Sequence, residues 1–254
     1  MNILTFSTLY PNAAQPHNGV FVENRLRHLV ADGNVSARVV APVPWFPNTA
    51  RIFGRYAEFA AVPREEERYG LHILHPRYPV IPAVGMNVAP AFLYAFARRA
   101  VHQIIGAGNE IDLIDAHYFY PDGVAAALLG RHFGKPVVIT ARGTDINLIP
   151  QYALPRRMIL WAARRAAGLI TVCQALKDSL VELGVEEDRV TVLRNGVDLE
   201  LFRPVEAQAH RLNVADRLTV TGIVPRDRVA QHVAAFDVAL NLDVVPYALA
   251  LKLF

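Results

Sequence analysis

The feature that most constrains the fold is the segment 111–145, in which two apolar runs flank a helical pattern. Residues 111–116 form the first run, and residues 136–141 form a second one that is uncharged and rich in β-branched residues, as in strands buried on both faces. Between them, Asp122 is placed to cap the start of a helix and Gly134 to end it. A strand, a crossover helix and a second strand predict a parallel, right-handed unit.

Polar residues follow both strands of this unit. His117 comes directly after the first strand, and Arg142, Gly143 and Asp145 come after the second. The carboxyl ends of parallel strands meet at one edge of a sheet, where the ligands of open α/β sheets gather. We therefore expect the two loops to face one cleft that holds a candidate functional site.

The chain up to residue 200 repeats this alternation and predicts one α/β domain with a seven-strand parallel sheet. The excursion from residue 42 to residue 90 is rich in prolines, and its acidic run at 65–67 is expected in an irregular surface loop. The other predicted strands are 2–7, 35–41, 71–75, 168–172 and 189–193, and the other predicted helices are 20–33, 89–105, 154–167 and 174–183.

Composition excludes several classes of protein. The 254 residues carry a net charge of +3 and are 53% hydrophobic, which is ample for a core and gives no reason to expect nucleic acid. The single cysteine, Cys173, excludes an internal disulfide and fits a reducing cytoplasm. His72 and His75 have no acidic or cysteine partner beside them and are interpreted as polar strand residues, so no metal site is expected.

No secretion signal or membrane span is predicted. Residues 1–7 lack a basic stretch ahead of their apolar run and are interpreted as a first strand. Residues 78–97 have the length of a span, but they contain Pro79, Pro82 and Pro90 and are interpreted as a loop that leads into a helix. We therefore expect the chain in the cytoplasm.

The most specific short motif follows the last predicted strand. It reads Asn-Gly-Val-Asp at residues 195–198, with Phe-Arg-Pro at 202–204. Asn-Gly tolerates the positive φ of a turn, and the asparagine side chain can bond its own backbone. Together with Asp-Ala-His at 115–117 and Arg-Gly-Thr-Asp at 142–145, this motif resembles the N-terminal domain of the family 4 glycosyltransferases.

The resemblance implies the GT-B architecture. Residues 1–200 would form the Rossmann-like, acceptor-side domain, and residues 205–254 would form a truncated second Rossmann-like domain for the donor. Most family members carry His-Gly where this chain has Arg142-Gly143, so the chain is most similar to the Arg-Gly-Ser/Thr-Asp variant. The first loop has neither a Gly-x-Gly-x-x-Gly nor a Gly-Lys-Ser/Thr motif, which argues against a dehydrogenase or a nucleoside triphosphatase.

The activity implied by the resemblance is transfer of a sugar from a nucleotide sugar to a glycan or lipid-linked acceptor, with retention of configuration and without a metal or other cofactor. Such transfer needs positive charge and N–H donors at the departing diphosphate, and a cleft that excludes water. The residues implied are His117 and Asp145 in catalysis, and Gly19, Arg142, Gly143, Asn195, Tyr247, Leu249 and Lys252 in binding.

These roles have plainer alternatives. Gly19 is equally well explained as a loop glycine before a helix, and Asp145 as the cap of the next turn. His117 is alternatively explained as a histidine at a strand end whose hydrogen bonds are satisfied within the protein. We expect His117 to be partly exposed, so that its replacement by alanine costs about 1 kcal/mol or less.

Two other functions stay open. A nucleotide-sugar 2-epimerase shares the two-domain architecture, although the Asn-Gly-Val-Asp motif favours a transferase. The incomplete second domain is expected to weaken donor binding and to impair transfer by this chain. It also favours an inactive remnant that binds an acceptor or a partner without turnover. The apolar residues of 205–254 are expected to pack poorly alone and to promote self-association.

The helix at 154–167 carries Arg156, Arg157, Arg164 and Arg165 around an apolar centre. A crossover helix with a solvated basic edge explains this pattern, because such a helix needs one apolar face in any case. The alternative is peripheral contact with an anionic membrane at the inner face, as in family members that use lipid-linked acceptors.

Overall fold

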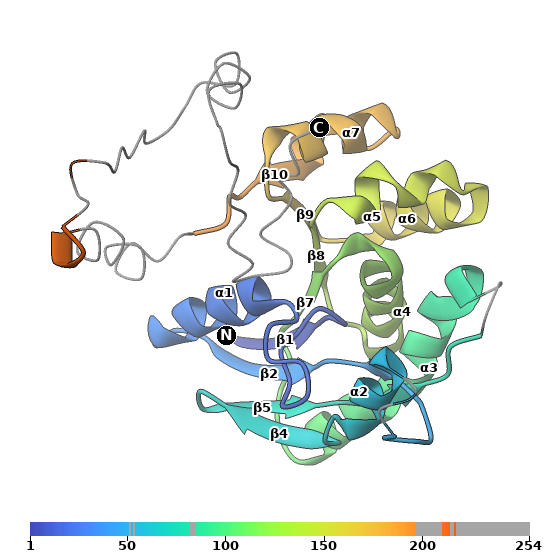
Figure 1. Cartoon of the computed structure of the whole chain (residues 1–254). Coiled ribbons are helices and arrows are strands. Elements are labelled where there is room, and N and C mark those ends of the chain that lie inside the picture. The colour runs from blue at the N-terminus through green and yellow to red at the C-terminus, as the bar shows by residue number, and fades with distance from the viewer. Residues whose placement is uncertain (51, 53, 82–84, 197–209, 214–215, 217–254) are drawn as a thin grey trace. The chain divides into compact units, whose positions relative to one another are not determined.

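The computed structural model describes residues 1–50, 52, 54–81, 85–196, 210–213 and 216. Residues Met1–Asn195 belong to one compact unit, an α/β domain (Figure 1). Apart from residues 210–213 and 216, the predicted partial domain at 205–254 lies outside the described residues. The domain boundaries therefore stay a prediction.

An eight-stranded sheet forms the centre of the unit, in the order β10-β9-β8-β7-β1-β2-β5-β4. Every neighbouring pair is parallel except β4 and β5, so the seven predicted parallel strands are confirmed and one antiparallel edge strand is added. The strands are β1 (Asn2–Phe6), β2 (Ser36–Val40), β4 (Glu65–Arg68), β5 (Leu71–Leu74), β7 (Leu113–His117), β8 (Val137–Ala141), β9 (Gly168–Thr171) and β10 (Val190–Val192).

The edge strand β4 corrects the prediction of an irregular loop at 65–67. Glu65 and Glu67 are exposed, while Glu66 turns inward and accepts a hydrogen bond from His75 Nε2 at 2.8 Å. Nδ1 of the same ring lies 2.9 Å from the main-chain oxygen of Ala41, so His75 does have an acidic partner. Strand pairing overrides the loop preference of charged residues, and a charged edge resists pairing with another chain.

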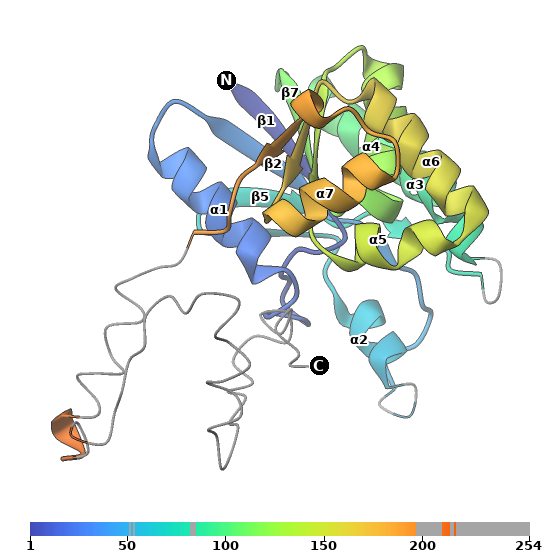
Figure 2. The same cartoon turned by 90° about the horizontal axis from the view of Figure 1, so that it is seen from above.

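Helices cover both faces of the sheet (Figures 1 and 2). Helix α1 lies on one face, and α3, α4 and α6 lie on the other, as right-handed crossovers require. The helices of the described residues are α1 (Val20–Ala31), α2 (Arg55–Ala61), α3 (Gly85–Gly106), α4 (Val124–Phe133), α5 (Thr144–Asn147), α6 (Ala153–Arg165) and α7 (Gln174–Glu182). A small parallel sheet joins β3 (Val43–Pro44) to β6 (Arg77–Tyr78), and short helical turns occupy Phe119–Gly123, Ile149–Gln151 and Glu187–Arg189.

The start of α4 differs from the prediction. Gly134 ends this helix in the left-handed conformation, as expected. Asp122, however, caps no helix: its carboxylate is fully buried and accepts from the Thr8 main-chain N–H at 2.5 Å and the Thr8 hydroxyl at 3.0 Å. The side chain therefore ties the loop after β1 to the loop after β7.

The apolar core lies mainly between the sheet and the helices of one face. Leu4, Ile114 and Ile139 of the central strands pack with Leu93 of α3 and Leu129 of α4, all fully or almost fully buried. None of the described helices combines the length and the apolar character needed to cross a membrane.

Close packing of α4 on β8 requires a glycine at position 130. A Cβ atom there would lie 2.3 Å from a Val137 side-chain carbon and 2.8 Å from the Lys135 main-chain oxygen. We expect Gly130→Ala to lower the free energy of unfolding by about 1 to 3 kcal/mol through overpacking, as measured by urea denaturation. Gly106→Ala is the matched control, because a Cβ atom at this helical glycine meets no atom within 4 Å. Equal effects of the two substitutions would contradict the packing argument.

Candidate functional site

The two loops predicted to share a cleft do lie at one edge of the sheet. His117 ends β7, Arg142 follows β8, and the two strands pair in register at His117 and Thr140. The Arg142 Nη2 atom lies 2.8 Å from His117 Nδ1. The structure therefore brings together the two side chains that sequence analysis placed at this edge.

His117 lies between an acid and a base. Its Nε2 atom is 3.0 Å from Asp115 Oδ2, and its Nδ1 atom faces the guanidinium of Arg142. A guanidinium only donates, so Nδ1 accepts, and the ring is neutral with its proton on Nε2. Burial lowers the pKa of His117, and the charges of Arg142 and Arg25 lower it further against the opposing effect of Asp115. Both ring nitrogens are thus engaged.

Asp115 is the ionised member of this network. Burial opposes ionisation, but contact with His117 and the charges of Arg25 and Arg142 outweigh it and lower the pKa of Asp115 to about 2. The side chain of Asp115 is 7% exposed. Asp115 therefore fixes the tautomer and the orientation of the His117 ring.

The expectation that His117 is partly exposed was wrong. Its side chain is 1% exposed, and its main-chain oxygen accepts a hydrogen bond from the Ser7 hydroxyl at 2.9 Å. The ring lies between Asp115 of its own strand and Arg142 of the loop after β8, and the approach of this second loop is a tertiary contact that local sequence does not reveal.

Arg142 is held by neutral groups. Nη1 donates to Asn195 Oδ1 at 2.8 Å, and the guanidinium carbon lies 4.7 Å from the centre of the Phe21 ring. The Nε atom is buried and has no hydrogen-bond partner among the described residues. Burial lowers the pKa of Arg142 to about 10, with a further contribution from the charge of Arg25.

Asp145 connects the two loops through the main chain. Its fully buried carboxylate accepts from the N–H groups of Phe119 at 2.6 Å, Arg142 at 3.1 Å and Gly143 at 2.7 Å. Burial raises the pKa of Asp145, and these hydrogen bonds oppose the rise. The geometry gives Asp145 a positioning role, while a direct part in catalysis stays a prediction.

Two glycines of the site have steric reasons to be glycine. Gly143 adopts φ 151° and ψ −90°, a conformation available essentially only to glycine. At Gly19, where φ is 70°, a Cβ atom would lie 2.2 Å from the main-chain oxygen of Leu9. Close packing of α1 on the loop after β1 thus accounts for Gly19, and its predicted binding role is untested.

The remaining predicted residues divide into two groups. Asn195 follows β10 and reaches the site through Arg142. Tyr247, Leu249 and Lys252 lie outside the described residues, so their predicted contacts with a ligand stay predictions. No group of three or more potential metal-ligating side chains occurs within the part of the chain that the structure describes.

Two members of the site were not predicted. Asp115 stands two residues before His117, and side chains two apart in a strand point to the same face; ending the predicted strand at residue 116, before His117, hid this signal. Arg25 of α1 donates to the Thr140 hydroxyl at 3.2 Å. Because Arg25 is far from both loops in the sequence, no local pattern marks it.

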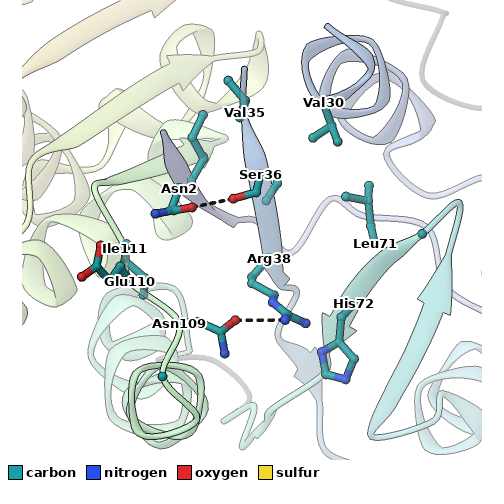
Figure 3. A pocket seen from close by; sticks show the side chains of 14 residues that line it. Asn2, Val30, Val35, Ser36, Arg38, Leu71, His72, Asn109, Glu110 and Ile111 are labelled. Atoms are coloured by element: carbon teal, nitrogen blue, oxygen red, sulfur yellow. Dashed lines mark hydrogen bonds between the residues drawn. The ribbon is translucent and has the colours of Figure 1, made fainter. Parts of the chain in front are cut away.

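A hollow of about 590 Å³ lies at the other edge of the sheet, where β1, β2 and β5 begin (Figure 3). Arg38 and Asn109 form a 3.0 Å hydrogen bond beside it, and His72 also lines it. None of the predicted site residues within the described chain lines this hollow. The candidate site is therefore the carboxyl edge, where the polar network lies.

Burial of His117 leads to a prediction that replaces the earlier one. We expect His117→Ala to lower the free energy of unfolding by about 3 kcal/mol, because it leaves Asp115 and one Arg142 donor without their partner. Urea denaturation measures the effect, with His17→Ala at an exposed position as the control. A loss no greater than that of His17→Ala would show that the network contributes nothing to stability.

Asp122 gives the domain a pH dependence of stability. Burial raises the pKa of Asp122 to about 7 from the usual 3.8, although two hydrogen bonds from Thr8 oppose the rise. Between these values the folded chain holds a proton that the unfolded chain has lost. The contribution of Asp122 to the free energy of unfolding is therefore lost as pH rises from about 4 to 7, by up to about 1.4 kcal/mol per pH unit.

We expect Asp122→Asn to flatten the pH dependence of the free energy of unfolding over that window, because asparagine does not titrate. Urea denaturation at several pH values measures the slope. Asp32→Asn, at an exposed position in α1's C-terminal turn, is the control. An unchanged slope in Asp122→Asn would place the titration elsewhere.

Comparison with known proteins identifies the family of the chain. The profile of Glycosyltransferase Family 4 matches residues 19–201. TuaC of Bacillus subtilis (strain 168) bears the name of a teichuronic acid biosynthesis glycosyltransferase. It is 29% identical over 189 residues, which are 72% of this chain and 46% of TuaC. The protein MJ1178 of Methanocaldococcus jannaschii, named an uncharacterized glycosyltransferase, is 31% identical over 92 residues, which are 36% of this chain and 26% of MJ1178. The chain thus spans about half or less of these relatives.

Solved structures resemble the fold. A sucrose-phosphate synthase structure from Thermosynechococcus elongatus superposes with a TM-score of 0.50 at 12% identity, over 84% of this chain and 99% of the other. Anabaena HepE in complex with UDP gives a TM-score of 0.49 at 18% identity, over 85% of this chain and 50% of HepE. The predicted α/β, Rossmann-like class is confirmed for the described residues. Since the family profile matches residues 19–201, which are well over half of the sequence, the chain belongs to glycosyltransferase family 4.

Proposed function

We propose that this chain takes part in the transfer of a sugar from a nucleotide-sugar donor to a glycan or lipid-linked acceptor, with retention of anomeric configuration. Membership of family 4 supports the reaction class. The observation that carries the proposal is the Asp115–His117–Arg142 network at the carboxyl edge of the sheet, where open α/β sheets bind ligands.

In the proposed reaction, the bond between the anomeric carbon and the donor phosphate oxygen breaks, and its electron pair leaves with the diphosphate. A bond forms between the anomeric carbon and the acceptor hydroxyl oxygen, and the hydroxyl proton passes to the departing phosphate. The protein needs mainly to orient the reactants and to stabilise charge. No metal or other cofactor is part of this proposal.

The roles of the site residues follow from their contacts. His117 is neutral and uses both ring nitrogens, so it holds Arg142 rather than removing a proton from the acceptor. Asp115 orients His117, and Asp145 holds the two loops together. Arg142 is the side chain that presents fixed positive charge at the edge.

The alternative function is a remnant that binds an acceptor or a partner without turnover. This alternative depends on the partial donor domain predicted at 205–254, and apart from residues 210–213 and 216 that segment lies outside the described residues. The rival epimerase activity is disfavoured by the match to a transferase family. Self-association through residues 205–254 stays a prediction on residues that are outside the described part.

Transfer and binding separate these alternatives. We expect the chain to release nucleoside diphosphate from a nucleotide sugar only when an acceptor is present, and Arg142→Gln to lower the rate at least about tenfold through loss of a fixed charge. Arg131→Gln, at an exposed position of α4, is the matched control and should leave the rate unchanged. Acceptor binding without any release would favour the remnant, and equal rates for both variants would remove Arg142 from the site.

A second proposal places the chain in the cytoplasm at the inner face of the membrane. Arg156 and Arg157 are exposed on α6, next to the exposed apolar side chains of Tyr152 and Leu154. Trp161 contributes little, since it packs on the core and lies under Arg165 at 4.5 Å. The start of α6, and not its centre, is thus suited to an anionic surface.

Vesicle sedimentation tests this contact. We expect binding to vesicles that contain an anionic lipid, and a loss of about tenfold or more on replacement of Arg156 and Arg157 by glutamine, at about 1 kcal/mol per arginine. The same replacement of Arg98 and Arg99, which are exposed on α3, is the control. Equal losses of vesicle binding for the two pairs would show that binding depends only on net charge and not on the start of α6.

A further inference from the structure

The carboxyl edge of the sheet carries two guanidinium groups that are in direct contact with no carboxylate of the described residues. Arg25 comes from α1 and Arg142 from the loop after β8. Among the described residues, neither forms an ion pair with a carboxylate within 4.0 Å. Their mutual repulsion contributes to the lowered pKa of Arg142. Two positive charges that are partly buried and lack a direct ion pair lower the stability of the folded chain.

The carboxylates of this edge are committed to other groups. Asp115 accepts from His117, and Asp122 accepts from Thr8. Asp145 is surrounded by main-chain N–H groups. Each carboxylate is almost fully buried, so none can swing out to pair with an arginine without breaking these hydrogen bonds.

The guanidinium of Arg142 is oriented as a recognition group would be. His117 and Asn195 accept from its two terminal nitrogens, and the Phe21 ring lies against one face. All of these partners are uncharged, and Nε has no partner in the described part of the chain. Beside it, Gly143 leaves space in which a Cβ atom would meet nothing within 4 Å.

We propose that Arg142, together with Arg25, binds an anionic group of the acceptor, so that the acceptor is a carboxylate- or phosphate-bearing sugar and not a neutral one. This inference rests on the proposed transfer function. The acceptor is preferred to the donor because both arginines lie in the segment 1–200, which the family resemblance assigns to the acceptor side. A guanidinium fork held in one plane suits the two oxygens of a carboxylate or phosphate.

Binding of matched sugars tests the proposal. The probes are methyl glucoside, methyl glucuronoside and glucose 6-phosphate, with UDP as the probe for the donor, titrated into the full chain by calorimetry. We expect at least one anionic sugar to bind about tenfold or more tightly than methyl glucoside, and added salt to reduce the difference. The glucuronoside and the phosphate distinguish the two anionic classes.

The variants assign the preference to residues. Arg142→Gln should abolish it, Arg25→Gln should reduce it, and Arg142→Lys should keep part of it, because lysine retains the charge but not the fork. Arg27→Gln, on the same helix but stacked on Tyr69 at 3.7 Å, should leave it intact. Circular dichroism and urea denaturation check that each variant is folded. If Arg142→Gln does not fold, Arg142→Lys provides the test of the guanidinium fork.

Three results of the binding experiment, and one result of a transfer assay, would overturn the proposal. One is equal affinity of the chain for neutral and anionic sugars. Another is that Arg142→Gln lowers the affinity for neutral and anionic sugars equally. The third is a loss of UDP binding alone in that variant, which would assign the arginine to the donor. Transfer to neutral acceptors as fast as to anionic ones would refute the inference and leave the proposed function intact. Selective binding of anionic sugars without transfer to any acceptor would instead refute the proposed function.

Discussion

The site depends on one buried carboxylate, Asp145. It gathers main-chain N–H groups from the loop after β7 and from the loop after β8. Without this connection the two loops would be joined mainly by contacts between side chains. Side chains at strand ends have rotamer freedom, and fixing their rotamers costs conformational entropy. Because Asp145 fixes the backbone at Arg142, the guanidinium starts from a defined position before His117 and Asn195 orient it.

Electrostatics at this edge follow from burial. A neutral His117 stands between the ionised Asp115 and the cationic Arg142, so the acid is separated from the base by an imidazole ring. The charge of Arg142 is thus stabilised indirectly and is not cancelled by a direct ion pair. An arginine of this kind keeps its attraction for an incoming anion, whereas a direct pair with a carboxylate would satisfy it inside the protein.

The fold supplies the scaffold for this arrangement at little cost. Seven parallel strands carry their carboxyl ends to one edge, and apolar packing of α3, α4 and α6 fixes the central strands from one side. Buried strand positions are rigid because close-packed interiors resist small displacements.

The sequence alone determined the parallel sheet, the helix periodicity and the meeting of His117 with Arg142, because apolar patterning and chain handedness are local properties. It did not determine the edge strand at 65–67, where pairing with β5 overrides charge. Only the tertiary structure decided the burial of His117 and the recruitment of Arg25. Those depend on which distant segments pack side by side, and no window of sequence contains both partners of such contacts.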